Sequence, residues 1–265
     1  MTLAAAVRQV FGFFGFLGRR TGKIRLFAVL GLIPIVLAVV VRIVAHGRTG
    51  PMAGVFTDIL MVFFLQFYIV ILSLFYGTSV TAEEVENKTL SYLITRPLPK
   101  PAIVLGKYAA YTTLMLALVA ISLAASFFII NASRLGDLEI YGAFLRYLGV
   151  LALGILAYTA FFTFLGALLK RAIIVGLVFG FGWENVIQYF PGSTQRFSIV
   201  HYLKSLLPYQ PVSGVPSGGR GVALLLFRLE PTKPLVAAAA LAVITAALVL
   251  AACWVFRTKE YLYEE

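Results

Sequence analysis

The sequence has few charged residues for its length, and this shortage excludes an ordinary soluble protein. Asp, Glu, Lys and Arg make up 12% of the 265 residues, whereas 61% are hydrophobic and the mean hydropathy is +0.95. Soluble domains carry about 25% charged residues. A core able to hide this much apolar surface from water would need a far larger chain. We therefore expect lipid to cover most of that surface.

Cysteine and histidine are also scarce, which argues against a disulfide framework or a metal centre. Cys253 is the only cysteine, so no intrachain disulfide, four-cysteine zinc site or CxxC redox motif can form. The two histidines, His46 and His201, fall in expected outer loops, and neither belongs to an H-E-x-x-H pattern. We expect no metal site and no catalytic residue in this chain.

Basic residues outnumber acidic residues by 22 to 11, and the formal net charge is +11. Such an excess can indicate a nucleic-acid-binding protein. Here, however, the Lys and Arg residues are scattered between apolar runs, which is typical of the loops of membrane proteins. We expect the chain to contact membrane lipid and no nucleic acid.

Six apolar runs are long enough to cross a membrane as helices, since about 20 residues span roughly 30 Å of hydrocarbon. The runs are Leu26 to Ala45, Phe56 to Gly77, Ala102 to Ile130, Phe144 to Leu169, Ala172 to Phe190 and Leu235 to Phe256. Strands of a membrane barrel would alternate apolar and polar residues, and these runs do not. The sequence predicts an all-α integral membrane protein with six transmembrane helices, in a single domain over residues 1–265.

The segment before the first run, residues 1–25, is expected to be an interfacial helix on the cytoplasmic leaflet. Its apolar residues come first and its basic residues come last, which is the reverse of a signal peptide. In this arrangement the aromatic side chains face lipid and the basic residues meet anionic headgroups. A short membrane-inserted hairpin is the alternative.

Charges around the first run predict that both termini are cytoplasmic. Five basic residues precede this run, whereas only Arg42 and Arg48 lie at or just beyond its end. The positive-inside rule then places the N-terminus in the cytoplasm, and an even number of spans places the C-terminus there too. The expected location is the cytoplasmic (inner) membrane.

The segment between the second and third runs combines acidic residues with an amphipathic helical pattern. It reads TAEEVENKTLSYLITRPLPKP over residues 81–101. Thr81 and Glu84 fit the capping box T-x-x-E, and the acidic residues of the first turns suit the positive end of a helix dipole. Three alternating prolines end the helix, because they lack amide donors. The segment is therefore expected to be a short, rigid cytoplasmic helix with a stiff connector into the third run.

At this point the chain resembles the permease subunits of type-2 ABC transporters, the exporter-class membrane domains with six helices per subunit. The resemblance rests on Glu83, Glu84, Glu86, Lys88, Thr89 and Leu90, then on Arg96-Pro97 and on Ile103-Val104-Leu105-Gly106-Lys107. The family pattern has acidic residues, T-L, a hydrophobic pair, R-P and a late G-K before the third helix. Family members often begin with a basic-acidic pair followed by an apolar residue, whereas this chain has Arg8-Gln9-Val10.

The resemblance implies that residues 81–101 form a coupling element that seats in a groove of an ATPase subunit. The side chains expected at that contact are Glu83, Glu84 and Glu86, which would meet basic groups, Thr89, Leu90 and Leu93, which would pack against the partner, and Arg96 at the connector. Lys107 is expected to extend to lipid headgroups rather than to touch nucleotide. A solvated acidic turn with an ordinary cap is the alternative.

A transporter needs an energy source, and this chain lacks the P-loop G-x-x-x-x-G-K-[ST]. The nearest match, Gly18 to Ile24, has three residues rather than four between its glycines, and Ile24 stands where a hydroxyl is needed. The resemblance therefore implies two copies of a separate ABC ATPase, which would bind ATP and magnesium. It also implies a second permease copy, and symmetry favours a homodimer. No cofactor is expected in this chain.

An acidic residue inside a membrane run is a candidate functional residue. Glu184 lies in the fifth run, followed by Asn185 and, one turn on, by Gln188, and these three are candidate substrate-path residues. Pairing of Glu184 with Arg196 or another base of the outer loop, or capping of a broken helix, are the alternatives to cargo contact. That loop, residues 191–234, is expected to contain a short amphipathic helix.

Two other functions are compatible with six membrane helices. A membrane-embedded enzyme would gather His, Asp, Glu or Ser side chains at one depth, and this chain offers few. A substrate-capture subunit of an energy-coupling-factor transporter would give no reason for a capped acidic helix. We therefore favour an ATP-driven permease, with export as the expected direction.

Overall fold

The protein is helical throughout the part of the chain that the computed structural model describes. That part comprises residues 2–20, 23–45, 56, 60–81, 99–169, 171–187, 193–207 and 232–258. Within these ranges every regular element is a helix and none is a strand. The all-α class predicted from the apolar runs is therefore confirmed for the described residues.

Among the described residues, four helices are long and apolar enough to cross a membrane. They are the continuous pair η1 (Leu60–Tyr68) and α4 (Ile69–Ser79), then α7 (Lys100–Ile130), α8 (Leu138–Leu168) and α13 (Pro234–Thr258). They correspond to the second, third, fourth and sixth predicted runs. Proline in the first turn of α7 costs no hydrogen bond, because the first amides of a helix have no partner within it.

The first and fifth predicted runs form shorter apolar helices. In α2 (Lys23–Ala45) the apolar stretch among the described side chains is Val29–Val44, and the apolar run in the sequence begins earlier, at Leu26. The fifth run divides into α9 (Ala172–Leu177), the π-helical segment η3 (Val178–Trp183) and α10 (Glu184–Val186). The membrane-protein class is supported by these helices, and the number of six spans stays a prediction.

Helix α2 follows α7 to its far end. Arg42 Nη1 donates hydrogen bonds to the carbonyl oxygens of Ile129 (2.7 Å) and Ile130 (3.1 Å), the last two residues of α7. A cation is favourable there, because the last carbonyls of a helix lack partners and carry the negative end of its dipole. Arg42 thus fixes the ends of the two helices together.

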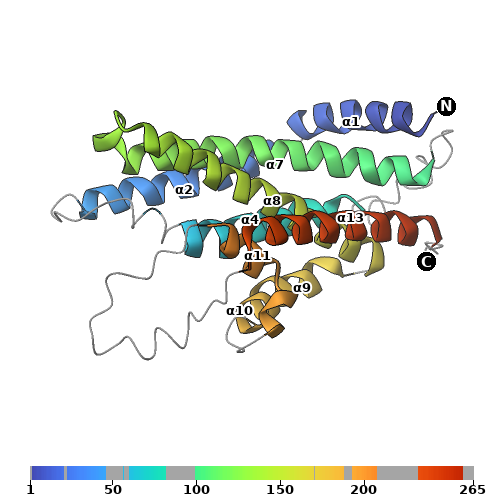
Figure 1. Ribbon diagram of the computed structural model, residues 1–265. Coiled ribbons are helices and arrows are strands. Elements are labelled where there is room, and N and C mark those ends of the chain that lie inside the picture. Colours follow the sequence, from blue (N-terminus) through green and yellow to red (C-terminus); the bar gives the residue numbers. More distant parts are fainter. Residues whose placement is uncertain are drawn as a thin grey trace.

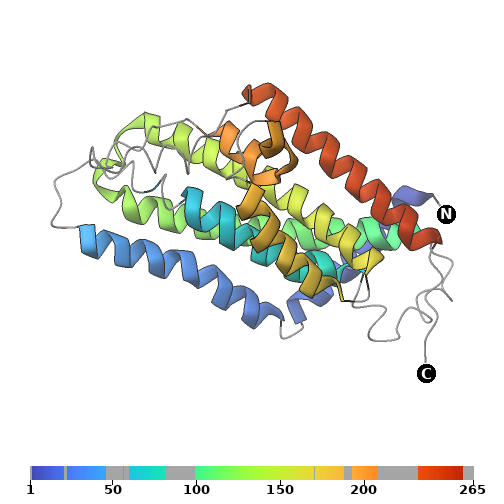
Figure 2. The same ribbon diagram turned by 90° about the horizontal axis from the view of Figure 1, so that it is seen from below.

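The long helices run lengthwise through the molecule (Figures 1 and 2). The start of α1 (Leu3–Arg20), the end of α4, the start of α7 and the end of α13 lie at one end, which we call the base. The described chain ends at Thr81, after α4, and resumes at Pro99, before α7. Helices α9, α10 and α11 (Ile199–Leu206) gather on one side, beside α4 and α13.

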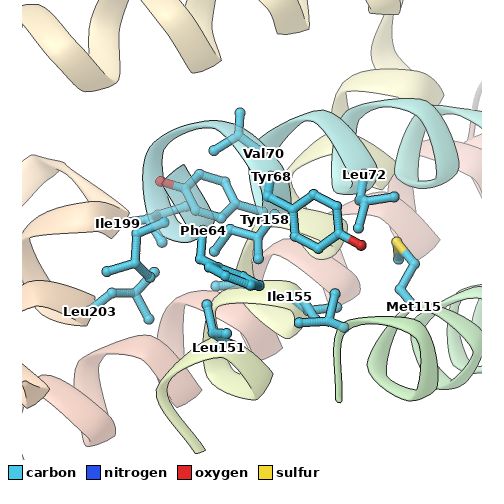
Figure 3. Close-up of a cluster of buried hydrophobic side chains, with 14 of the residues drawn as sticks. Phe64, Tyr68, Val70, Leu72, Met115, Leu151, Ile155, Tyr158, Ile199 and Leu203 are labelled. Atoms are coloured by element: carbon cyan, nitrogen blue, oxygen red, sulfur yellow. The ribbon is translucent and has the colours of Figure 1, made fainter. Parts of the chain in front are cut away.

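The centre of the bundle is a cluster of buried apolar side chains (Figure 3). Phe64, Leu151 and Ile155 are fully buried between η1 and α8. Met115 of α7 lies on one side of the cluster, and Ile199 and Leu203 of α11 lie on the other. The amphipathic helix predicted within residues 191–234 is therefore present as α11, and its apolar face packs into the core.

Helix α1 packs one face along the first turns of α7. Ala6, Val10 and Phe14 are buried at successive turns of α1, whereas Phe11 and Phe13 are exposed on other faces. The contact is close because Gly106 of α7 has no side chain: a Cβ there would lie 2.6 Å from Val10 Cβ. The predicted helix is thus present, and its place on a lipid surface stays a prediction.

Candidate functional site

The residues assigned to ATPase contact by the resemblance lie outside the described chain. These are Glu83, Glu84, Glu86, Thr89, Leu90, Leu93 and Arg96. The structure does describe both points where the chain joins this segment, at the end of α4 and at the start of α7. These two joints, which we call the exit and the return, form the first candidate site.

The exit is held against the end of α8. Thr81 is fully buried, and its Oγ1 donates a hydrogen bond of 3.3 Å to the carbonyl oxygen of Thr163. Gly166, one turn further along α8, permits this approach. A Cβ on Gly166 would lie 2.5 Å from Thr81 Oγ1 and 2.9 Å from the carbonyl oxygen of Thr78. Helix α8 therefore touches the backbone of the exit directly.

The return is held through Lys107, whose side chain is fully buried. Lys107 Nζ donates a hydrogen bond of 3.3 Å to the carbonyl oxygen of Ser79, the last residue of α4. It also lies 4.8 Å from the centroid of the Phe14 ring of α1. The prediction that Lys107 extends to headgroups is wrong, because contacts from α1 and α4 enclose the ammonium group within the base.

The second candidate site surrounds Glu184, which is 2% exposed. Its carboxylate accepts hydrogen bonds from the Ser198 hydroxyl, from the Ile199 amide (3.1 Å) and from the Val200 amide (3.4 Å). The Ser198 hydroxyl in turn accepts from the His201 amide at 3.3 Å. These amides open α11 and have no acceptor within it. Glu184 and Ser198 together cap α11.

A buried base from the same helix faces this carboxylate. Lys204 is 8% exposed and interacts electrostatically with Glu184. Burial lowers the pKa of the Lys204 ammonium group to about 8, and the charge of Glu184 opposes that shift. Tyr158 of α8, which is fully buried, also faces Glu184. Arg196, the base named first as an alternative from the sequence, is exposed, and Lys204 is another base of the same outer loop.

Helix α11 is also tied to the start of α13. His201 Nε2 and Thr232 Oγ1 lie 3.0 Å apart, and the Thr232 amide donates to Ser205 Oγ at 3.2 Å. Glu184 therefore holds one end of a polar chain that runs from α10 through α11 to α13. Of the roles left open for this residue by the sequence, the hydrogen bonds match helix capping, with α11 as the helix that is capped. The electrostatic interaction with Lys204 matches the alternative of another base of the outer loop.

The other two candidate substrate-path residues are Asn185 and Gln188. Asn185 belongs to α10, but its side chain lies outside the described set, as does Gln188 altogether. The substrate-path role of these two residues therefore stays a prediction.

A family model described as "ABC-2 family transporter protein" matches residues 17–183. This range covers more than half of the chain and includes the exit, residues 82–98 and the return. The chain belongs to the ABC-2 transporter family. It is accordingly a multi-pass membrane permease subunit of an ABC transporter, and the resemblance stated from its sequence is confirmed. Comparison with curated proteins gives no match.

Family membership also bears on the two alternative functions considered from the sequence. ABC-2 permeases are transport components and are not themselves catalytic, so the family match favours neither an enzyme nor an energy-coupling-factor subunit. The family implies pairing with an ABC ATPase. The match ends at Trp183, one residue before Glu184, so the cap on α11 lies beyond the matched range.

The sequence reasoning named neither Ser198 nor Tyr158 at the second site of this ABC-2 permease, and it included Lys204 only among the bases of the outer loop. Ser198 could have been recognised from the sequence as a helix cap, because a serine directly before an apolar helical run is a typical N-cap. Tyr158 could not be recognised from the sequence, and the choice of Lys204 among the loop bases could not be made, since both depend on how α8 and α11 pack.

Proposed function

We propose that this ABC-2 permease exports a substrate by using ATP hydrolysis on a separate ABC ATPase, with residues 81–101 as the coupling element. The working assembly is a permease homodimer with two ATPase subunits that bind ATP and magnesium. Both termini are cytoplasmic, and the assembly lies in the cytoplasmic membrane. The base, which holds the exit and the return, then faces the ATPase.

One observation supports the coupling role above others: both joints of residues 82–98 are anchored to several helices. Thr81 bonds to α8, and Lys107 bonds the end of α4 to the start of α7 beside α1. A force applied to the segment therefore reaches α1, α4, α7 and α8 through short contacts. Interfaces and packed cores convert such small shifts into discrete rearrangements.

Replacing Glu84 with lysine tests the coupling role. If Glu84 meets basic groups of the ATPase, the reversed charge should reduce the recovery of the ATPase with tagged permease by about tenfold or more, since like-charge contacts cost several kcal/mol at an interface. The measurement is co-purification from native membranes, followed by ATP hydrolysis of the recovered complex.

Glu139→Lys is the matched control, because Glu139 is an exposed acid in the first turn of α8, at the end away from the base. This variant should recover the ATPase as the unchanged chain does. Equal ATPase recovery and equal hydrolysis with Glu84→Lys would contradict the proposed role of Glu84.

A further inference from the structure

Lys107 is a fully buried cation at the base, and its surroundings come from three helices. Its Nζ donates to the carbonyl oxygen of Ser79 on α4, lies 4.8 Å from the ring centroid of Phe14 on α1, and lies 5.9 Å from that of Tyr111 on α7. Removing an ammonium group from water is unfavourable unless such contacts replace the water. The position of the charge therefore depends on α1, α4 and α7 together.

The contacts of Lys107 with the Ser79 carbonyl oxygen and with the Phe14 ring stabilise a cation more than they would an apolar side chain. Ser79 ends α4, so its carbonyl oxygen has no partner within the helix and lies at the negative end of the helix dipole. The face of the Phe14 ring attracts a cation through its quadrupole. Methionine at position 107 would fill a similar volume but would make neither interaction.

The contacts of Lys107 join the exit, through the carbonyl oxygen of Ser79, to the Phe14 ring of helix α1. Gly106, its neighbour, sits against Val10 of α1, and this close approach places the Lys107 ammonium group beside α1. We propose that Lys107 is a positioning residue that transmits displacement of the coupling segment from the end of α4 to α1. This inference rests on the proposed function, because it needs a segment that an ATPase displaces.

Amide hydrogen exchange of the full permease–ATPase complex in nanodiscs tests the proposal without knowledge of the transported substrate. Exchange is compared between the ADP-bound complex and the complex trapped with ATP and vanadate. In the unchanged protein, both residues 82–98 and helix α1 should alter their exchange between the two states. In Lys107→Met, residues 82–98 should still respond, whereas the response of α1 should fall about fivefold, within the range expected for residues that couple two sites.

Two further variants separate transmission from general stability. Lys107→Arg keeps the cation and should restore most of the α1 response. Lys233→Met removes an exposed lysine directly before α13, outside the coupling element, and should leave the response unchanged. The apparent unfolding temperature of each variant is measured beside exchange, because a purely structural role would lower stability and α1 response together.

The outcomes distinguish this inference from the proposed function. If residues 82–98 do not respond to nucleotide in the unchanged complex, the proposed function fails, and the inference fails with it. If they respond and α1 in Lys107→Met responds as fully as in the unchanged protein, the inference alone is overturned. It is also overturned if the α1 response is lost only in proportion to a fall in unfolding temperature.

Discussion

Replacing Glu184 with alanine should destabilise the protein by about 3–5 kcal/mol, because each buried donor left without its acceptor costs about 1–3 kcal/mol. The change removes the acceptor of the Ile199 and Val200 amides and leaves Lys204 buried without the carboxylate that faces it. We expect the apparent unfolding temperature in detergent to fall by about 10 °C. Exchange of the α11 amides should rise first, since their cap is lost.

Two control variants make this result specific. Glu139→Ala removes an exposed acid and should change stability by less than about 0.5 kcal/mol. Combining Glu184→Ala with Lys204→Met should recover part of the loss, because no charge is then left buried at this site. An unfolding temperature equal to that of the unchanged protein for Glu184→Ala would show that the carboxylate does not hold α11.

Replacing Gly166 with valine should separate the end of α8 from the exit of α4. The new Cβ would meet the carbonyl oxygen of Thr78 at 2.9 Å and its Cα at 3.2 Å, and backbone atoms cannot turn aside as a flexible side chain can. Overpacking of this kind costs about 1–3 kcal/mol. We expect the apparent unfolding temperature to fall by about 5 °C.

Gly149→Val is the matched control on the same helix, because a Cβ at Gly149 would meet no atom within 4 Å. Both variants carry the same cost of placing valine in a helix, so the difference between them reports the steric contact alone. Equal unfolding temperatures for the two variants would contradict the close packing of α8 on the exit.

The long membrane helices could be predicted because a helix that crosses lipid must be about 20 residues long and mostly apolar, and both features can be read from the sequence. Helix α7 was bounded within two residues at its start and ended at the predicted Ile130. Helix α8 begins at Leu138, six residues before the predicted start at Phe144. Residues 138–143 include polar side chains, so they were not counted in the apolar run. Neither π-helical segment, η1 nor η3, was predicted, because apolar periodicity does not report the hydrogen-bond register.

The candidate sites were predictable only where they depend on neighbours in the sequence. Glu184 was recognised as a charge in an apolar run, but its partners Ser198 and Lys204 come from a separate helix. The burial of Lys107 could not be foreseen, since a lysine near a helix end ordinarily reaches headgroups. The Lys107 side chain is buried partly because α1 packs along the start of α7, and the sequence pattern of α1 does not specify that packing.

Cysteine cross-linking of residues 81–101 to an ABC ATPase tests the central claim most directly. The native Cys253 is replaced with alanine, a single cysteine is introduced as Glu86→Cys, and native membranes are treated with a short bifunctional maleimide. The comparison variant is Leu138→Cys, at the 85% exposed first residue of α8, away from the base. We predict a cross-link to the ATPase from Glu86→Cys and none from Leu138→Cys. A cross-link from Leu138→Cys alone, or from neither position in membranes that contain the ATPase, would contradict the account.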